Sequence, residues 1–517
     1  LALSSGRVGR PSAAGRPGDP TAPGQDTDGV GEGFRVAGVR GGPDTGGPDP
    51  GVEEYMDKMI AEDTIEYKQF LDTKRQAGIL HGFAGSYLPD FLFDFQKALL
   101  EWSLRKGRSG IFADCGLGKT PMQLVWAENI IRETNKPVLV ITPLAVSHQT
   151  ISEGEKFGIE VSRSIDGSHG CGITVTNYER LHHFSPSDFD GVVCDESSIL
   201  KSFDGQRKAL ITDFMRKVPY RLLCTATAAP NDYIELGTSS EALGDLGYVD
   251  MLNQFFINDQ NTTAPNRFWD GGGWRFKHHA EQSFWRWVSS WARAIRRPSD
   301  LGFDDQGFEL PPLDIQEMVV AAKTVKQGML FDVAAVGLQD EREARRRTIN
   351  ERCEAAAARV NETTRPAVMW CHLNDEGNTL KAMVPGSVQV AGSDSDDMKE
   401  SKFRDFQEGN IRVLITKPKI GAFGLNWQHC AHMTYFPSHS YEQYYQAIRR
   451  CWRFGQESPV MVNLVSTDAD ERIVENLARK SKAADKMFSD LVQHMNNALT
   501  IKRSQEYEEE VSIPSWL

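Results

Sequence analysis

The sequence predicts an α/β fold with two lobes, each built on a parallel sheet. From residue 90 to about 245, short apolar runs alternate with stretches of helical periodicity, and a second series of this kind follows at about 366–490. Strands separated by helices are typical of βαβ units, in which helices cover both faces of the sheet. A length of 517 residues is also too great for one hydrophobic core, which indicates more than one domain.

The predicted strands are short runs rich in Val, Ile and Leu. In the first lobe, residues 90–249, they are GIFAD, PVLVITP, GITVTNY, GVVCDE and YRLLCTAT. In the second lobe, residues 324–490, a charged helix at 324–362 precedes AVMWC, SVQVAG, IRVLITK, HMTYFP and VMVNLVS. Residues 250–323 are aromatic, basic and rich in loops, which indicates a structured helical insertion between the lobes.

Three further segments lie outside the lobes. Residues 1–51 consist mainly of Gly, Pro, Ser, Ala, Asp and Arg, with too little apolar surface to offset the entropy of ordering. We expect disorder there, a helical segment at 52–89 and an exposed acidic tail at 491–517. The first methionine is Met56, so our hypothesis places the natural start at Met56 or Met59, and a genuine flexible tail is the alternative.

The composition excludes several classes of protein. Hydrophobic residues make up 40% of the chain and no apolar run approaches the ~18 residues of a membrane span, so no membrane partner is expected. The eight cysteines form no CxxC pair, which favours reduced thiols in a cytoplasmic protein over a disulfide or zinc framework. A net charge of -13 argues against nonspecific coating of nucleic acid but allows a local basic track.

A phosphate-binding loop is predicted where the first strand ends. In IFADCGLGKTPMQ the strand ends at Asp114, Gly116 and Gly118 allow a tight turn, and Lys119 and Thr120 open a helix. Backbone N–H groups and the helix N-terminus would face phosphate oxygens, Lys119 would reach the β- and γ-phosphates, and Thr120 would bind Mg²⁺. The spacing therefore indicates a nucleoside triphosphate site.

An acidic pair at the end of another strand supplies the second half of such a site. The run FDGVVCDESS places Asp195 and Glu196 directly after apolar residues. Asp195 is expected to hold Mg²⁺, and Glu196 to orient and deprotonate the attacking water. A solvated acidic turn is the alternative, and the phosphate-binding loop makes it the weaker one.

The motifs also occur in a recognisable order across about residues 90–490. They read LFDFQKALLEW, DCGLGKT, VLVITPLAVSHQTISEGEKF, ITVTNYERL, VVCDESSILKS, RLLCTATAAPNDYIEL, AVMWCHLNDEGNTL, VLITKPKIGAFGLNWQ and QAIRRCWRFGQ. This order resembles the superfamily 2 helicases of the DEAD/DEAH-like type, and most of all the Swi/Snf-type ATPase branch in a compact bacteriophage-like form. The resemblance implies two RecA-like lobes of the P-loop NTPase class, ATP and Mg²⁺ bound between them, a nucleic-acid partner, and a bacterial or phage-infected host cell.

The resemblance assigns roles to individual residues. Nucleotide binding falls to Gln96, Gly116, Leu117, Gly118, Lys119 and Thr120. Catalysis falls to Lys119, Asp195, Glu196, Gln446, Arg450 and Arg453. Coupling of hydrolysis to movement falls to Thr225, Thr227, Gly424 and Asn426. Departures from the usual pattern are Ala113 in the phosphate-binding loop, Ser198 after the acidic pair, Ala228–Pro230, and Ala422.

The arginines of YYQAIRRCWRFGQ lie in the second lobe and would meet a nucleotide held by the first. Arg450 and Arg453 are expected to reach the γ-phosphate only when the lobes close, an effect worth roughly 10³ to 10⁵ in rate. Arg449 is left outside the catalytic set because its position varies in role. Nucleic acid that spans both lobes would then stimulate hydrolysis.

Nucleic-acid contacts are expected in the basic stretch between the lobes. Arg296 and Arg297 resemble a pair of arginines that ends a helical protrusion in the same family, and they are the candidates for backbone phosphate contacts. The aromatic residues at 284, 287 and 291 recur with Ile295 at helical spacing, which predicts core packing rather than base stacking.

Three functions are consistent with these features. The leading prediction is a DNA-stimulated ATPase that translocates along double-stranded DNA. A strand-separating helicase or RNA remodeller would use the same site on another substrate. A nucleic-acid-binding scaffold with a vestigial nucleotide pocket is the alternative from a different class, and the intact Lys119, Asp195, Glu196, Arg450 and Arg453 argue against it.

Overall fold

The computed structural model describes residues 80–201, 205–229, 232–258, 274–321, 338–421 and 425–508. The expected disordered leader, the proposed start at Met56 or Met59, and most of the helical segment at 52–89 lie outside these residues. Within them, no helix is both long and apolar enough to cross a membrane.

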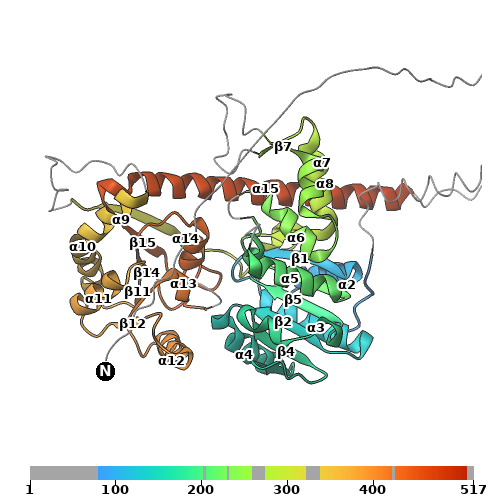
Figure 1. Ribbon diagram of the computed structural model, residues 1–517, viewed down its shortest axis with the longest axis horizontal. Helices are drawn as coiled ribbons and strands as arrows, with labels where there is room; N and C mark the ends of the chain where they lie inside the picture. Colours follow the sequence, from blue (N-terminus) through green and yellow to red (C-terminus); the bar gives the residue numbers. More distant parts are fainter. Residues whose placement is uncertain are drawn as a thin grey trace, which may run out of the picture. The chain divides into compact units, whose positions relative to one another are not determined.

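The predicted α/β architecture is confirmed, because the described residues form two large parallel sheets (Figure 1). The first sheet has the strand order β3-β4-β2-β5-β6-β1-β9. Its strands are β1 Arg108–Ala113, β2 Val138–Thr142, β3 Val161–Arg163, β4 Ile173–Asn177, β5 Gly191–Asp195, β6 Tyr220–Cys224 and β9 Ala292–Ile295. The second sheet has the order β10-β15-β14-β11-β13-β12. Its strands are β10 Leu313–Val319, β11 Ala367–Trp370, β12 Val388–Val390, β13 Val413–Thr416, β14 His432–Tyr435 and β15 Val460–Ser466.

Helices cover both faces of the first sheet, as the continuous apolar strands require. Successive residues of β1 point to opposite faces, so that Ile111 packs with one core and Phe112 with the other. The core around Ile111 includes α2 Asp94–Lys106 and α3 Lys119–Thr134. The core around Phe112 includes α5 Gln206–Lys217, α6 Glu235–Leu243, α7 Tyr248–Phe255 and α8 Ala280–Trp291. Helix α4 Ser147–Phe157 contacts α3 and β4.

The second sheet is covered in the same way. Trp370 of β11 packs with Phe403 of α12 Asp396–Gln407 on one face. On the other face, Met369 packs with α10 Ile349–Asn361 and α11 Asn374–Met383. The lobe also contains α9 Leu338–Arg347, α13 Pro418–Gly421 and α14 Tyr441–Ile448.

The boundaries of the expected insertion at 250–323 are wrong, because much of it is built into the two lobes. Strand β9 adds to the edge of the first sheet beside β1, and β10 adds to the second sheet beside β15. Among the strands in the described part of the chain, the short antiparallel pair β7 Phe256–Asn258 and β8 Trp274–Phe276 alone stands outside the two sheets. The predicted core role of the aromatic residues is confirmed, since Phe284, Trp287 and Trp291 are buried under the first sheet.

Helices also depart from the expected boundaries. The charged helix expected at 324–362 is two helices, α9 and α10, in the part that the structure describes. Residues 80–89 form a loop rather than a helix, because the N–H groups of His81, Gly82 and Phe83 bond to the last carbonyls of α2.

The second lobe does not end at residue 490, because a single helix, α15 Glu471–Glu508, runs through that position (Figure 1). Near its start, Ile473 and Leu477 pack against Tyr441 of α14 in the second lobe. Further along, Met487 and Phe488 join the core of the first lobe. One continuous helix therefore contacts both lobes.

Candidate functional site

The predicted phosphate-binding loop lies at the carboxyl edge of the first sheet, between β1 and α3. Gly116 and Gly118 both adopt left-handed backbone conformations, with φ of 93° and 73°, which residues with a Cβ rarely adopt. Gly118 is the N-cap of α3, so the helix N-terminus points into the loop. The Lys119 ammonium lies inside the turn, where Nζ donates to the Ala113 carbonyl at 2.9 Å. The loop thus has the geometry of an anion cradle.

Gln96 braces this loop from α2. Its Oε1 accepts a hydrogen bond from the Phe93 N–H at 3.0 Å, and its Nε2 donates to the Leu117 carbonyl at 2.9 Å. A Cβ at Gly118 would lie 2.3 Å from the same Nε2. Gln96 therefore holds the loop at Leu117, while its expected role in nucleotide binding stays a prediction.

The acidic pair lies at the same edge, because β5 and β1 are both neighbours of β6. Gln123 of α3 donates to Asp195 Oδ1 at 2.6 Å, and the Tyr178 hydroxyl donates to the Asp195 carbonyl. Burial and the adjacent carboxylate of Glu196 raise the pKa of Asp195 to about 7. Burial is the largest cause, so the ionised carboxylate of Asp195 is poorly solvated at this position.

Glu196 is held by groups from both lobes. Its φ of 51° is left-handed, an uncommon conformation for this residue type that occurs at functional turns. Its Oε2 accepts from the Thr225 hydroxyl of the first lobe and from Gln446 Nε2 of the second, each at 3.3 Å. Thr227 N–H in turn donates to the Thr225 hydroxyl at 3.1 Å. The structure thus brings together the expected base and two of the residues expected to couple to it.

The arginine closest to the phosphate-binding loop is the one left out of the catalytic set. Arg449 forms an ion pair with Asp114 at 2.7 Å and donates to the Cys115 carbonyl at 3.0 Å. The Tyr445 hydroxyl donates to the other oxygen of Asp114. Burial by itself would lower the pKa of Arg449, but Asp114 and Tyr445 outweigh it and raise that pKa above its ordinary value. The second lobe is therefore in direct contact with the loop.

Arg450 and Arg453 lie beside this contact. Arg450 donates to the Leu425 carbonyl at 2.8 Å and to Gln446 Oε1 at 3.2 Å, both within the second lobe. Arg453 donates to Leu425 at 3.3 Å, while its buried Nε has no hydrogen-bond partner among the described residues. Burial and the neighbouring Arg450 lower the pKa of Arg453 to about 10. The guanidinium groups of Arg450 and Arg453 thus lie together on the second lobe's side of the site.

Glu153 of α4 lies where the two lobes meet. Burial raises its pKa, against the opposing effects of a hydrogen bond from Gln149, the charge of Arg453 and a hydrogen bond from Thr120. Arg453 and Thr120 therefore both lie close to one carboxyl group, although they belong to different lobes.

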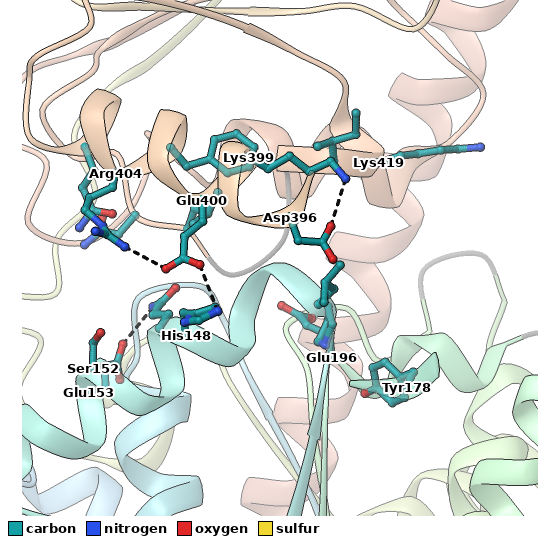
Figure 2. Close-up of a pocket in the computed structure, with 18 of the residues that line it drawn as sticks. His148, Ser152, Glu153, Tyr178, Glu196, Asp396, Lys399, Glu400, Arg404 and Lys419 are labelled. Atoms are coloured by element: carbon teal, nitrogen blue, oxygen red, sulfur yellow. Dashed lines mark hydrogen bonds and ion pairs between the residues drawn. The ribbon is translucent and has the colours of Figure 1, made fainter. Parts of the chain in front are cut away.

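A cavity of about 920 Å³ adjoins Glu196 and is lined by both lobes (Figure 2). Helix α12 faces α4 across it, and His148 Nε2 lies 3.0 Å from Glu400 Oε2. Glu400 also pairs with Arg404 at 2.9 Å on its own helix. Leu425 and Asn426 complete the wall beside Glu196, and Asn426 Oδ1 is a buried acceptor without a hydrogen-bond partner in the described residues.

The arginines expected to contact nucleic acid face carboxylates of the chain itself. Arg296 pairs with Asp485 of α15 at 3.0 Å and lies over the Phe488 ring at 4.8 Å. Arg297 is 64% exposed and lies 3.9 Å from both Asp300 and Asp305. A nucleic acid at Arg296 would have to compete with α15.

The predicted nucleotide-site residues that the structure describes therefore converge, whereas Arg296 and Arg297 face carboxylates of the chain itself. Gly424 lies outside the described residues. Sequence reasoning missed four side chains that position the others: Asp114, Gln123, Tyr445 and Arg449. Asp114 and Arg449 each adjoin a recognised motif residue. Their position beside a motif residue is the signal in the sequence that could have identified them, but it does not reveal which arginine meets which carboxylate.

Comparison with known proteins relates the chain distantly to helicases. No known protein family profile matches it. Putative protein p41 of Acyrthosiphon pisum secondary endosymbiont phage 1 is 25% identical over 462 aligned positions, which cover 75% of this chain and 96% of that protein. The bifunctional helicase and thymine dioxygenase JBP2 of Leishmania infantum is 32% identical over 105 residues. The mouse DNA annealing helicase and endonuclease ZRANB3 is 29% identical over 180 residues.

The helicase matches are partial. They cover 20% of this chain and 10% of JBP2, and 30% of this chain and 17% of ZRANB3. They support a helicase-like relationship for the matched stretch, while the similarity to the phage protein extends along most of the chain.

Proposed function

We propose that this protein is a nucleic-acid-stimulated ATPase that couples ATP hydrolysis between its two lobes to movement along duplex DNA. The observation that carries the proposal is the convergence of three groups on one edge of the first sheet. The phosphate-binding loop and the acidic pair belong to the first lobe, and the arginine contact comes from a residue 334 positions further along the chain.

ATP and Mg²⁺ fit the residues present. Gly116 and Gly118 form a cradle in backbone conformations that favour glycine, and the buried Arg453 Nε offers a donor without an acceptor in the described residues. The raised pKa of Asp195 indicates a carboxyl group that a cation would stabilise in its ionised form. Thr120 and Asp195 are the groups that would hold Mg²⁺, which when bound would supply positive charge to the phosphate oxygens.

The chain's own residues would then divide the chemistry between the lobes. Glu196 would orient a water and accept its proton at a carboxylate oxygen, and Thr225 and Gln446 hold that carboxylate in place. Lys119, Arg450 and Arg453 would balance negative charge that develops on the phosphoryl group. Because Gln446 and both arginines belong to the second lobe, hydrolysis requires the lobes to meet.

Nucleic acid is proposed as the partner that favours this closed arrangement. A polymer that contacts both lobes shifts the equilibrium only as far as it binds the closed form more tightly than the open one. JBP2 and ZRANB3 are both named as helicases, which supports a nucleic-acid substrate for the related stretch. Among nucleic acids, we propose duplex DNA as the polymer along which the protein moves.

Phosphate release with and without duplex DNA, single-stranded DNA and RNA tests the proposal. We expect duplex DNA to stimulate release, and Glu196→Gln to lower the stimulated rate by at least about 10²-fold. Glu179→Gln is the matched control, since Glu179 lines the same cavity but is exposed and pairs with Arg207. Equal, negligible release by the wild type and Glu196→Gln under every condition would favour a non-hydrolysing scaffold.

The kind of movement needs a second comparison. Displacement of a triplex strand without fork unwinding is the expected result for a duplex translocase. Fork unwinding without triplex displacement would indicate a strand-separating helicase, and stimulation by RNA alone would indicate an RNA remodeller. Replacing Arg296 and Arg297 with Ala should weaken DNA binding and its salt dependence while nucleotide affinity is retained.

A further inference from the structure

The second lobe touches three consecutive residues of the phosphate-binding loop. Asp114 is bound by Arg449 and Tyr445, and the Cys115 carbonyl accepts from Arg449. At Gly116 a Cβ would lie 3.0 Å from the Phe454 ring. These contacts meet the start of the loop, before Lys119, and are separate from the arginines expected to face phosphate.

The Asp114–Arg449 pair is buried and connects the second lobe to the loop backbone. Arg449 is 1% exposed and Asp114 is 7% exposed. Asp114 Oδ1 also accepts the Cys115 N–H at 2.6 Å, so the same carboxylate holds the first turn of the loop and the second lobe. Removing either partner by mutation would leave an uncompensated buried charge, which is strongly unfavourable in this arrangement. Asp114 and Arg449 belong to different lobes, so the pair forms only when the two lobes are together.

We propose that Arg449 is a positioning residue that acts through Asp114 to couple lobe closure to the shape of the phosphate-binding loop. In the closed arrangement Arg449 and Tyr445 fix the Asp114 carboxylate, which fixes Cys115. When the lobes separate, the carboxylate loses both partners and the start of the loop is released. The expected effect on ATP binding rests on the proposed function, whereas the expected effect on lobe closure does not.

Closure can be measured in the full chain without nucleotide. Cys171 is the exposed cysteine of the first lobe, and Glu362→Cys provides a second exposed label in the second lobe. Single-molecule energy transfer between the two labels reports the fraction of closed molecules. We expect Arg449→Gln and Asp114→Asn each to shift the open-to-closed ratio at least tenfold, about 1.4 kcal/mol, toward the open form.

Further variants separate positioning from a merely structural effect. The double variant Arg449→Gln, Asp114→Asn should reduce the closed fraction no more than the more damaging single variant, because both changes remove the same ion pair. Arg449→Lys keeps the charge and should retain part of the closure. Arg449→Gln should, besides losing closure, raise KM for ATP.

The outcomes distinguish this inference from the proposed function. Unchanged closure in both Arg449→Gln and Asp114→Asn would overturn it, as would fully additive effects in the double variant. A wild type that closes but never releases phosphate would refute the proposed function. Loss of closure in Arg449→Gln of that same protein would still support the positioning role of Arg449. The exposed Arg479→Ala is the matched control and should close like the wild type.

Discussion

Gly116→Ala tests the loop and its contact with the second lobe in one substitution. The backbone at Gly116 has a φ of 93°, a conformation that costs a residue with a Cβ about 1–3 kcal/mol. The new methyl group would also lie 3.0 Å from Cδ2 and 3.4 Å from the backbone N of Phe454. Phe454 cannot easily withdraw, because Gln428 donates to its carbonyl and its ring packs against Phe308.

The two costs should appear in different measurements. The backbone cost belongs to the loop itself, so affinity for a fluorescent ATP analogue should fall about 5- to 150-fold, the range that 1–3 kcal/mol implies. The steric cost belongs to the lobe contact, so the closed fraction should also fall. Combining Gly116→Ala with Phe454→Ala should restore space between the lobes but not the nucleotide affinity.

Gly386→Ala is the matched control for backbone strain. Gly386 has a φ of 73°, and a Cβ there would meet no atom within 4 Å. This variant should lose a similar amount of stability, with unchanged nucleotide affinity and closure. If Gly116→Ala kept the wild-type nucleotide affinity and closed fraction, neither the left-handed backbone at Gly116 nor its contact with Phe454 would matter for these properties.

Three further predictions concern catalysis, stability and pH. Thr225→Val removes the 3.3 Å hydrogen bond to Glu196 and should lower the stimulated kcat about tenfold with little change in KM, whereas Thr225→Ser should retain activity. Equal kcat values for Thr225→Val and the wild type would show that Thr225 does not hold the Glu196 carboxylate for catalysis. Arg352→Met breaks a buried 2.8 Å ion pair with Glu376 and should lower the free energy of unfolding by about 3–5 kcal/mol in denaturant titrations. The double variant Arg352→Met, Glu376→Gln should lose less stability than the sum of the two single variants, because both changes remove the same pair. Burial lowers the pKa of His372 to about 4, below its ordinary 6.5, so the unfolded chain takes up this proton first as the pH falls. Stability should therefore decline between pH 6.5 and 4 by at most about 3 kcal/mol, and His372→Gln should flatten that decline.

Much of the fold followed from local patterns. The predicted strands correspond to β1, β2, β4, β5 and β6 in the first sheet and to β11–β15 in the second. Apolar runs bounded by turns act over a few residues, so they can be recognised without knowledge of their neighbours. Strands β9 and β10 were missed because their short runs lie in a basic, aromatic stretch, and only pairing with β1 and β15 identifies them as part of the sheets.

In the candidate site, too, the local features could be predicted from the sequence, whereas the contacts between the lobes could not. The glycine turn between β1 and α3 and the position of the acidic pair could be predicted, because glycine position, strand end and helix start are all local features. The sequence could not rank three neighbouring arginines, since their roles depend on which of them faces the first lobe after both lobes have folded.

From the sequence alone came the two α/β lobes, the glycine turn at Gly116–Lys119 between a strand and a helix, and the acidic pair at Asp195–Glu196. The tertiary structure alone decided that Arg449 meets Asp114, that Gln446 reaches Glu196, and that α15 contacts both lobes. The physical reason is that secondary structure and tight turns are set by near neighbours along the chain. A buried ion pair between residues more than 300 positions apart depends instead on how two separately folded cores come into contact.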